Sequence, residues 1–110
     1  MWGLSRSTRV FLRPGPTDLR LGFEALYGLV ENQLQQNPLS GHLFLFCNRH
    51  RTRLKALCWD GSGLWLCTKR LEKGTFAWTP AGTSEEIDAG KFHALVEGLD
   101  IRAERKWFRR

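Results

Sequence analysis

The chain has 110 residues, of which 42% are hydrophobic, including seven Phe and five Trp. A chain of this length forms one hydrophobic core, and this apolar content excludes a wholly disordered protein. Seventeen Lys and Arg against eleven Asp and Glu give a net charge of +6, which favours polyanionic partners without choosing among them.

The chain contains three Cys, an odd number, and each lies within an apolar run. This arrangement is typical of reduced, buried thiols rather than of a disulfide framework. No apolar run is long enough to cross a bilayer, and the first residues lack an apolar signal core. We therefore expect a cytoplasmic protein that has no membrane partner.

The first predicted element is a short strand over residues 9–13. Val10 and Leu12 point to one side of it and Phe11 to the other, with the period of two that strands show. The run Pro14-Gly15-Pro16 ends the strand, because proline lacks the backbone donor that a sheet requires.

The second predicted element is a helix over residues 18–36. Thr17 or Asp18 can accept the free amide hydrogens of its first turn. Asn37-Pro38 ends the helix, because the residue before proline avoids helical angles. The apolar positions recur at spacings of three and four, as on one face of a helix: Leu19, Phe23, Leu26, Tyr27, Val30 and Leu34.

From residue 42 onward the apolar period changes from 3.6 to 2, which predicts four successive strands. Between the second and third of them, Asp60-Gly61-Ser62-Gly63 predicts a tight hairpin, because Asp and Gly tolerate the positive φ that such turns need. The predicted strands span residues 42–47, 53–59, 64–69 and 75–78.

The last predicted element is a helix that Asp88 caps, with a buried stripe of Phe92, Leu95, Val96 and Leu99. The order is strand, helix, four strands, helix, and the hairpin connections are too short for parallel crossovers among the middle strands. This order predicts an α+β fold with a mostly antiparallel sheet of about five strands packed with two helices. We expect a single domain over residues 1–101 and a basic C-terminal tail over residues 102–110.

The hairpin register separates the two faces of the predicted sheet. The apolar face is expected to pack under the helices, and it collects Leu54, Ala56, Cys58, Trp65 and Cys67. On the reverse face, cationic and aromatic side chains mix with apolar ones, so this face is expected to meet a partner. It collects Arg53, Lys55, Leu57, Trp59, Leu64, Leu66 and Thr68.

Five separated segments resemble TnpB, the small accessory protein of the IS-sixty-six (IS66) family of insertion sequences. Their order and spacing carry the resemblance, which covers roughly residues 9–101. The resemblance implies a role in DNA transposition beside a separate, larger transposase that carries the catalytic carboxylates. The family is distinct from the RNA-guided nuclease that shares the letters TnpB. The segments are residues 17–30, 40–46, 54–64, 69–78 and 95–100.

The residues themselves supply no constellation for catalysis. The acidic residues fit helix caps, turns and solvated faces, and neither a serine-hydrolase nor a phosphate-loop motif is present. Cys47-Asn48-Arg49-His50 has zinc-like spacing, but a structural zinc site needs two further ligands. We therefore predict a protein that is not an enzyme and that has no metal and no cofactor.

Basic residues concentrate in two connections of the predicted sheet, where guanidinium and ammonium groups suit DNA phosphates. Trp59 is a candidate for stacking on unpaired bases. The alternatives remain that the charged turns are simply solvated and that Trp59 belongs to the core. The cationic candidates are Arg49, Arg51, Arg53, Lys55, Lys69, Arg70 and Lys73.

These inferences predict a non-catalytic accessory protein for transposition of an insertion sequence. It would act with the transposase of the same element and bind DNA, the ends of that element, through its basic turns. The alternative is a protein-interaction module that binds only the transposase. The tail over residues 102–110 fits an arm that clamps DNA, a segment that docks onto the transposase, or a solvated end.

Overall fold

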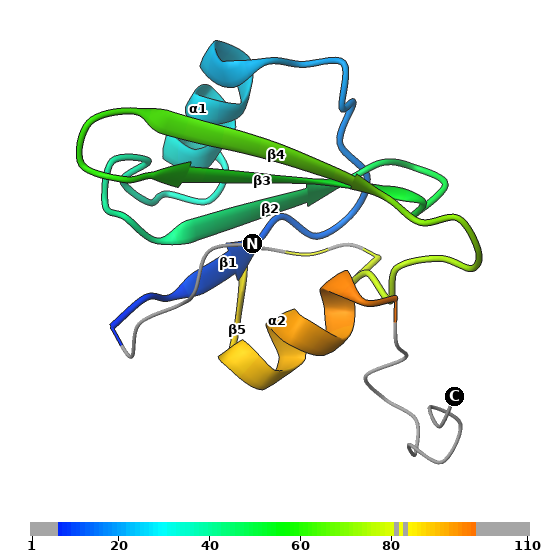
Figure 1. Cartoon of the computed structure of the whole chain (residues 1–110). Coiled ribbons are helices and arrows are strands. Elements are labelled where there is room, and N and C mark those ends of the chain that lie inside the picture. Colours follow the sequence, from blue (N-terminus) through cyan, green and yellow to red (C-terminus); the bar gives the residue numbers. More distant parts are fainter. Residues whose placement is uncertain (1–6, 81, 83, 99–110) are drawn as a thin grey trace.

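In this computed structural model, residues 7–80, 82 and 84–98 are described. They form one five-stranded sheet, with α1 on one face and α2 on the other (Figure 1). The elements are β1 (Val10–Leu12), α1 (Phe23–Asn32), β2 (Leu43–Cys47), β3 (Arg53–Trp59), β4 (Leu64–Arg70), β5 (Glu85–Ile87) and α2 (Ala89–Val96).

The strands lie in the order β4-β3-β2-β1-β5. β1 and β2 are parallel, with α1 in the connection between them, and every other neighbouring pair is antiparallel. The predicted α+β class and the mostly antiparallel sheet are confirmed. Because β1 and β2 are parallel, their carboxyl ends lie at the same edge of the sheet, so the segments after them start side by side.

The sheet is buried on both faces at its centre, where all five residues of β2 are buried. Since strand side chains alternate, Leu43, Leu45 and Cys47 join the core under α2, while Phe44 and Phe46 join the core under α1. A strand covered on both faces is a continuous apolar run, which is what Leu43–Cys47 is.

The first helix is shorter than predicted. It begins at Phe23 rather than at residue 18 and ends at Asn32 rather than at 36. Asp18 does not cap it; the Asp18 carboxylate accepts a hydrogen bond from the backbone N–H of Arg20 instead. The cause is a long-range backbone bond from Thr17 N to the Cys47 carbonyl at 2.8 Å, which ties this segment to the sheet before the helix can start.

The predicted apolar face of that helix is also only partly right. Leu26, Val30 and Leu34 are buried, but Phe23 is 47% exposed at the first turn. Because the chain before Gly22 is not helical, Leu19 does not continue the helical stripe; it packs against the α1 core from the preceding loop.

The predicted strand over residues 75–78 is absent, and β5 takes its place in the sheet. Phe76 and Trp78 are buried with the period of two that suggested a strand, but they fill the core on the α2 side. The free edge of β1 pairs with Glu85–Ile87, whose charged sequence shows no apolar alternation. Alternating burial thus arose here from loop packing rather than from a ladder of strand bonds.

The hairpin and the second helix match their predictions. The register pairs Trp59 with Leu64, and Asp60 N donates to the Gly63 carbonyl at 3.0 Å. Asp88 caps α2 by accepting from Lys91 N at 2.8 Å. Leu99, the end of the predicted domain and the tail over residues 102–110 lie outside the described residues.

The predictions for the two faces of β3 and β4 both need correction. Leu54, Ala56 and Cys58 pack under α2 as predicted, but Trp65 is 56% exposed and Cys67 is only partly buried rather than packed. The reverse face is largely covered, because α1 packs against it. Its end at the start of β3 is not covered by α1, and this end carries the basic residues. On the rest of this face Leu57 is buried, and Leu64 and Leu66 are partly buried.

Candidate nucleic-acid interface

The side chain of Asn48 organises the turn between β2 and β3. Its Oδ1 accepts hydrogen bonds from the backbone N–H groups of Thr52 at 2.9 Å and Arg53 at 3.0 Å. Arg51 N donates to the Asn48 carbonyl at 3.1 Å. Because these bonds close within the turn, it keeps a defined shape and presents Arg49, Arg51 and Arg53 to solvent.

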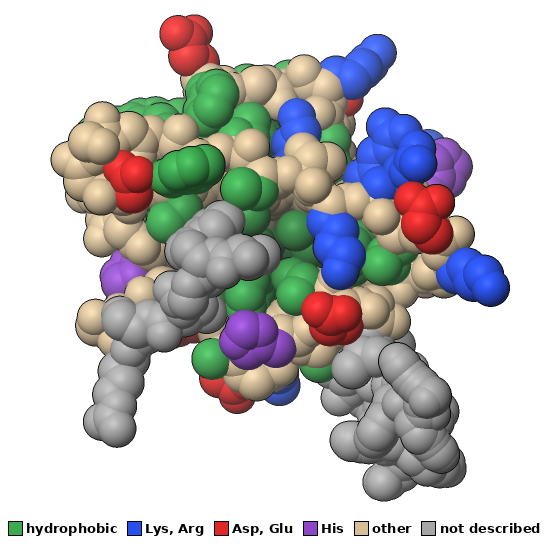
Figure 2. Space-filling view, in the orientation of Figure 1, with side chains coloured by type: hydrophobic (Ala, Val, Ile, Leu, Met, Phe, Trp, Pro, Cys, Tyr) green, Lys and Arg blue, Asp and Glu red, His purple; other side chains and the backbone are tan. Residues whose placement is uncertain are grey.

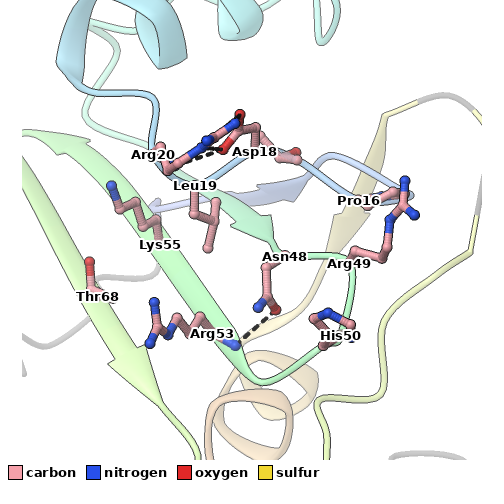
Figure 3. Close-up of a pocket in the computed structure, with 11 residues that line it drawn as sticks. Pro16, Asp18, Leu19, Arg20, Asn48, Arg49, His50, Arg53, Lys55 and Thr68 are labelled. Carbon is pink, nitrogen blue, oxygen red and sulfur yellow. Dashed lines mark hydrogen bonds and ion pairs between the residues drawn. The ribbon is translucent and has the colours of Figure 1, made fainter.

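A depression of about 820 Å³ lies beside this turn. Its walls come from the segment after β1, the β2–β3 turn, the start of β3 and one residue of β4 (Figure 3). The segment after β1 reaches the turn because β1 and β2 are parallel. The lining residues are Pro16, Thr17, Asp18, Leu19, Arg20, Asn48, Arg49, His50, Arg53, Lys55 and Thr68.

The depression has one acidic residue, and that residue is already paired. Asp18 Oδ2 lies 2.8 Å from Arg20 Nη2, and the hydrogen bonds from the Arg20 side chain lower the pKa of Asp18 to about 2. Within the described residues, Arg49, Arg53 and Lys55 form no ion pair, although Lys55 Nζ donates to the Leu21 carbonyl at 3.2 Å. Three cations therefore face this depression without a carboxylate to neutralise them.

Positive charge is concentrated in this part of the molecule. Residues 49–73 carry seven Lys and Arg against two acidic residues, a net charge of +5 out of the +6 of the whole chain. Figure 2 shows Lys and Arg side chains gathered on one side of the molecule, the side where Figure 1 places the β2–β3 turn. The opposite end of the sheet carries the hairpin, which has Asp60 and no cation.

Comparison with known proteins identifies the family. The family model described as "IS66 Orf2 like protein" matches residues 8–106, which is most of the chain. The chain belongs to this family. The resemblance to the IS66 accessory protein that the sequence predicted is confirmed, and this Orf2-like chain is an insertion-sequence associated accessory protein.

Two relatives of the Orf2-like chain come from Sinorhizobium fredii (strain NBRC 101917 / NGR234). "Uncharacterized protein y4hO" is 40% identical over 98 residues, which cover 88% of this chain and 85% of the relative. "Uncharacterized protein y4jC" is 38% identical over 108 residues, which cover 96% and 92% respectively. No solved structure matches the chain.

The other four predicted cations of the Orf2-like chain lie outside this depression. Arg51 is exposed beside it, at a smaller hollow that Trp78 also lines. Lys69 lies on the opposite face of the sheet, where its Nζ donates to the Val96 carbonyl at 2.6 Å. Arg70 pairs with Arg53 in the strand register and contacts Glu72 at 3.4 Å, and Lys73 is exposed in the loop after β4.

The structure does not bring Trp59 to the basic depression. Trp59 ends β3 and Arg53 begins it, so the two are about 20 Å apart at the ordinary rise of a strand. Trp59 is half-buried beside the hairpin. Trp78 is 7% exposed and its Nε1 donates to the Arg13 and Gly15 carbonyls, which makes it a core residue.

Sequence reasoning missed several residues of the site, above all Arg20, Asn48 and His50. Thr68 was placed correctly on the face expected to meet a partner, where the register sets it opposite Lys55. Arg20 was assigned to a helix, and only the parallel pairing of β1 with β2 brings its segment to the turn. His50 and Asn48 carried the signal of a polar turn, but the acceptor role of Asn48 depends on the turn geometry.

The acidic residues near the sheet have structural contacts. Asp88 caps α2, and the pKa of Asp60 falls to about 2 because it accepts hydrogen bonds from the backbone of Ser62 and from the Trp65 side chain. Cys47 is buried under α2, whereas His50 is exposed at the turn. Among residues 7–80, 82 and 84–98, no group of His, Cys, Asp and Glu could hold a metal ion, and no helix could cross a membrane.

Proposed function

We propose that this chain is a non-catalytic helper of its transposase that binds the DNA ends of the element through the basic depression. The observation that carries this proposal is the set of three cations without acidic partners, Arg49, Arg53 and Lys55, around one concave surface. Arg51 and Arg70 lie at the rim of the depression and Lys73 lies farther out, and we include all three in the proposed DNA site.

Phosphate contacts fit this chemistry. Guanidinium groups donate in a planar fork that matches phosphate oxygens, and an ammonium group adds a point charge. The hydroxyl of Thr68 and the amide of Asn48 supply further polar groups on the same surface. Such contacts position a protein on DNA without reading its sequence, so the affinity is expected to depend strongly on salt.

A second candidate is a module that binds only the transposase. A specific observation favours it: Phe23 is 47% exposed and lines an apolar hollow of about 260 Å³ with Tyr27, Leu64 and Glu24. This surface lies on the α1 side, near the hairpin end of the sheet rather than at the basic depression. Binding of the transposase there is compatible with DNA binding at the basic depression.

The test is binding of the full chain to the end sequences of its own element, with and without the transposase. Wild type is compared with Arg49→Ala combined with Arg53→Ala. The control combines Arg9→Ala with Lys91→Ala, which removes the same charge far from the depression. Arg9 does pair with Glu86, but an exposed pair of this kind adds little stability.

For wild type, the logarithm of the binding constant is expected to fall linearly with the logarithm of the salt concentration. The depression variant is expected to bind about tenfold or more weakly at low salt, with a salt slope smaller by about 2. The control variant is expected to keep the affinity and the salt slope of wild type. Absence of any salt-dependent binding, alone and with the transposase, contradicts the DNA proposal. Nuclease-resistant co-purification with the transposase, without DNA binding, establishes the second candidate instead.

A further inference from the structure

The outer edge of β4 is an open strand edge. β4 is seven residues long and lies at the end of the sheet, and no strand of the described chain pairs with its outer side. The opposite edge, β5, has only three residues and begins with Glu85 and Glu86. Short, charged edge strands resist pairing with another chain, whereas long, regular ones invite it.

The hydrogen bonds of the hairpin show which groups of β4 face outward. Gly63 accepts from Asp60 N, and Leu71 N donates to the Thr52 carbonyl, so odd-numbered positions bond to β3. In an antiparallel pair the bonding residues alternate along each strand. The backbone groups of Leu64, Leu66, Thr68 and Arg70 therefore point away from the sheet, available to a neighbouring strand.

The sequence of β4 is complementary to itself when a second copy runs antiparallel. Centred on Cys67, the pairing uses all seven residues and puts outward-facing groups opposite one another, Leu64 with Arg70 and Leu66 with Thr68. On the other face it puts Trp65 opposite Lys69. Each cation then meets an apolar residue, whereas a parallel copy would align like charges, which destabilises a strand pair.

The charges at the two ends of the strand favour the same arrangement. The hairpin beside Leu64 carries Asp60, whose low pKa keeps it ionised, and no cation. The other end carries Lys69 and Arg70, with Glu72 and Lys73 after them, so it stays positive, at a net +2, although Glu72 contacts Arg70. Antiparallel pairing brings the acidic hairpin of each copy toward the basic end of its partner, and a two-fold axis does this twice.

We propose that two copies of this chain associate through antiparallel pairing of their β4 strands, joining two five-stranded sheets into one continuous sheet. Trp65, which is 56% exposed in the single chain, becomes covered at this edge. This inference does not rest on the DNA proposal: Arg49, Arg53 and Lys55 take no part in the pairing, although Thr68 and the rim residue Arg70 belong to the paired strand. One strand pair buries less than the roughly 1,600 Å² of a standard interface, so the association is expected to be weak, with a Kd in the micromolar range or above.

The pairing predicts a specific chemical reporter. On the two-fold axis, Cys67 faces its own copy as a non-hydrogen-bonded pair, with Cα atoms about 4.5 Å apart, a separation that a disulfide accepts. Cys67 is partly exposed, whereas Cys47 is buried and burial raises its pKa to about 12, which suppresses the reactive thiolate. An added thiol oxidant of the diamide class, which takes up the two thiol hydrogens, is expected to link the chains at Cys67.

The experiment measures the mass of the full chain in solution without DNA, by sedimentation over roughly 5 to 300 µM, a range set by the weak affinity expected. The mass is expected to rise toward that of two chains. Oxidation is expected to give a linked dimer through Cys67, mapped by mass spectrometry of its peptides. Cys67→Ser is expected to abolish the link and leave the rise in mass.

Charge exchange across the pair provides the matched variants. Trp65→Lys places a cation opposite Lys69 and is expected to weaken association at least tenfold. Adding Lys69→Glu to the Trp65→Lys variant creates an opposite-charge pair and is expected to recover the association. Leu39→Lys makes a matching change at another exposed large apolar residue, outside the proposed binding surfaces, and is expected to leave the mass unchanged.

Three results overturn the proposal. One is a single-chain mass throughout, with no link at Cys67. Another is a dimer that is linked through a different residue and whose association is not weakened by Trp65→Lys. The third is a monomer in which deletion of residues 99–110 speeds alkylation of Cys67, because the edge would then be covered by the end of the same chain.

Discussion

The two turns that flank β3 are built by the same device and differ in charge. In the β2–β3 turn, Asn48 Oδ1 accepts from two backbone N–H groups, those of Thr52 and Arg53. In the β3–β4 hairpin, Asp60 Oδ1 accepts from the backbone N–H groups of Ser62 and Gly63. An amide replaces the carboxylate in the basic turn, so the turn is organised without adding a negative charge among its cations.

The two turns also differ in the residue that adopts a positive φ. In the hairpin this residue is Gly61, at φ 103°, while in the basic turn it is Arg51, at φ 60°. A left-handed conformation costs a non-glycine residue about 1 kcal/mol or more. The basic turn thus accepts backbone strain and keeps a cation where the hairpin uses glycine, which is expected of a surface selected for charge rather than for stability alone.

The largest expected effect comes from removing the acceptor of the basic turn. Asn48→Ala leaves the partly buried N–H of Thr52 without its partner and frees that of Arg53, so the free energy of unfolding is expected to fall by about 2 kcal/mol. Denaturant unfolding measures this. Asp60→Ala is the matched change in the hairpin and is expected to lose less, because water reaches that turn freely. Equal losses in the two variants would show that the Asn48 contacts stabilise the fold no more than the Asp60 contacts do.

The next effect separates the shape of the basic turn from its charge. Asn48→Asp keeps an oxygen acceptor for the turn but adds a carboxylate to the depression, so the fold is expected to persist while DNA affinity at low salt falls about tenfold. Asp60→Asn, the reverse exchange in the hairpin, is expected to leave DNA affinity unchanged. Filter-binding or anisotropy titrations of both variants measure this. Equal affinity for wild type and Asn48→Asp would place the DNA contact elsewhere.

The same contrast shows which parts of the structure could be predicted from sequence. The hairpin at Asp60 was predictable because its residues, spacing and flanking alternation all lie close together along the chain. The basic depression was not, because it forms where the chain after β1 meets the β2–β3 turn, and that meeting depends on the parallel pairing of β1 with β2. The individual cations Arg49, Arg53 and Lys55 were identified in advance, but not the concave surface they share.

The misassigned strand illustrates the same limit. Phe76 and Trp78 alternate as a buried strand would, and nothing local distinguishes a strand from a loop that packs every second side chain. Glu85–Ile87 has no such pattern, yet it pairs with β1 because the edge of that strand is available to it. Pairing is a property of two segments, so a periodicity within one segment cannot settle it.

A smaller effect is expected at the strained residue. Arg51→Gly removes the left-handed strain and is expected to raise the free energy of unfolding by up to about 1 kcal/mol, while Gly61→Ala lowers it by about 1 kcal/mol. At the same time Arg51→Gly is expected to lower the salt slope of DNA binding by about 1. Thermal and denaturant unfolding, with DNA titrations in parallel, measure the two changes. If Arg51→Gly gains stability and keeps the salt slope of wild type, Arg51 does not contact DNA.

The smallest effect is the pH dependence that the hairpin carboxylate carries. Hydrogen bonds from the Ser62 backbone and the Trp65 side chain hold the pKa of Asp60 at about 2, below its ordinary value of 3.8. A depressed pKa contributes stability that is complete above the unfolded value and is lost as pH falls from about 5 toward 2. Asp60→Asn keeps an acceptor but cannot titrate, so its urea midpoint is expected to change less between pH 7 and pH 3 than that of wild type.

Asp18 has a similarly low pKa, which its contacts with Arg20 cause, and it remains in Asp60→Asn. Part of the acid sensitivity is therefore expected to persist in that variant and to shrink further when Asp18→Asn is added. Glu86, whose pKa is lowered by its hydrogen bonds with Arg9, is expected to keep the remainder. Because Asn48 has no charge to lose, the β2–β3 turn itself should hold its shape over this whole pH range. If Asp60→Asn were as acid-sensitive as wild type, the hairpin carboxylate would be acting only as a geometric acceptor, as Asn48 does, and the two turns would differ in charge without differing in energetics.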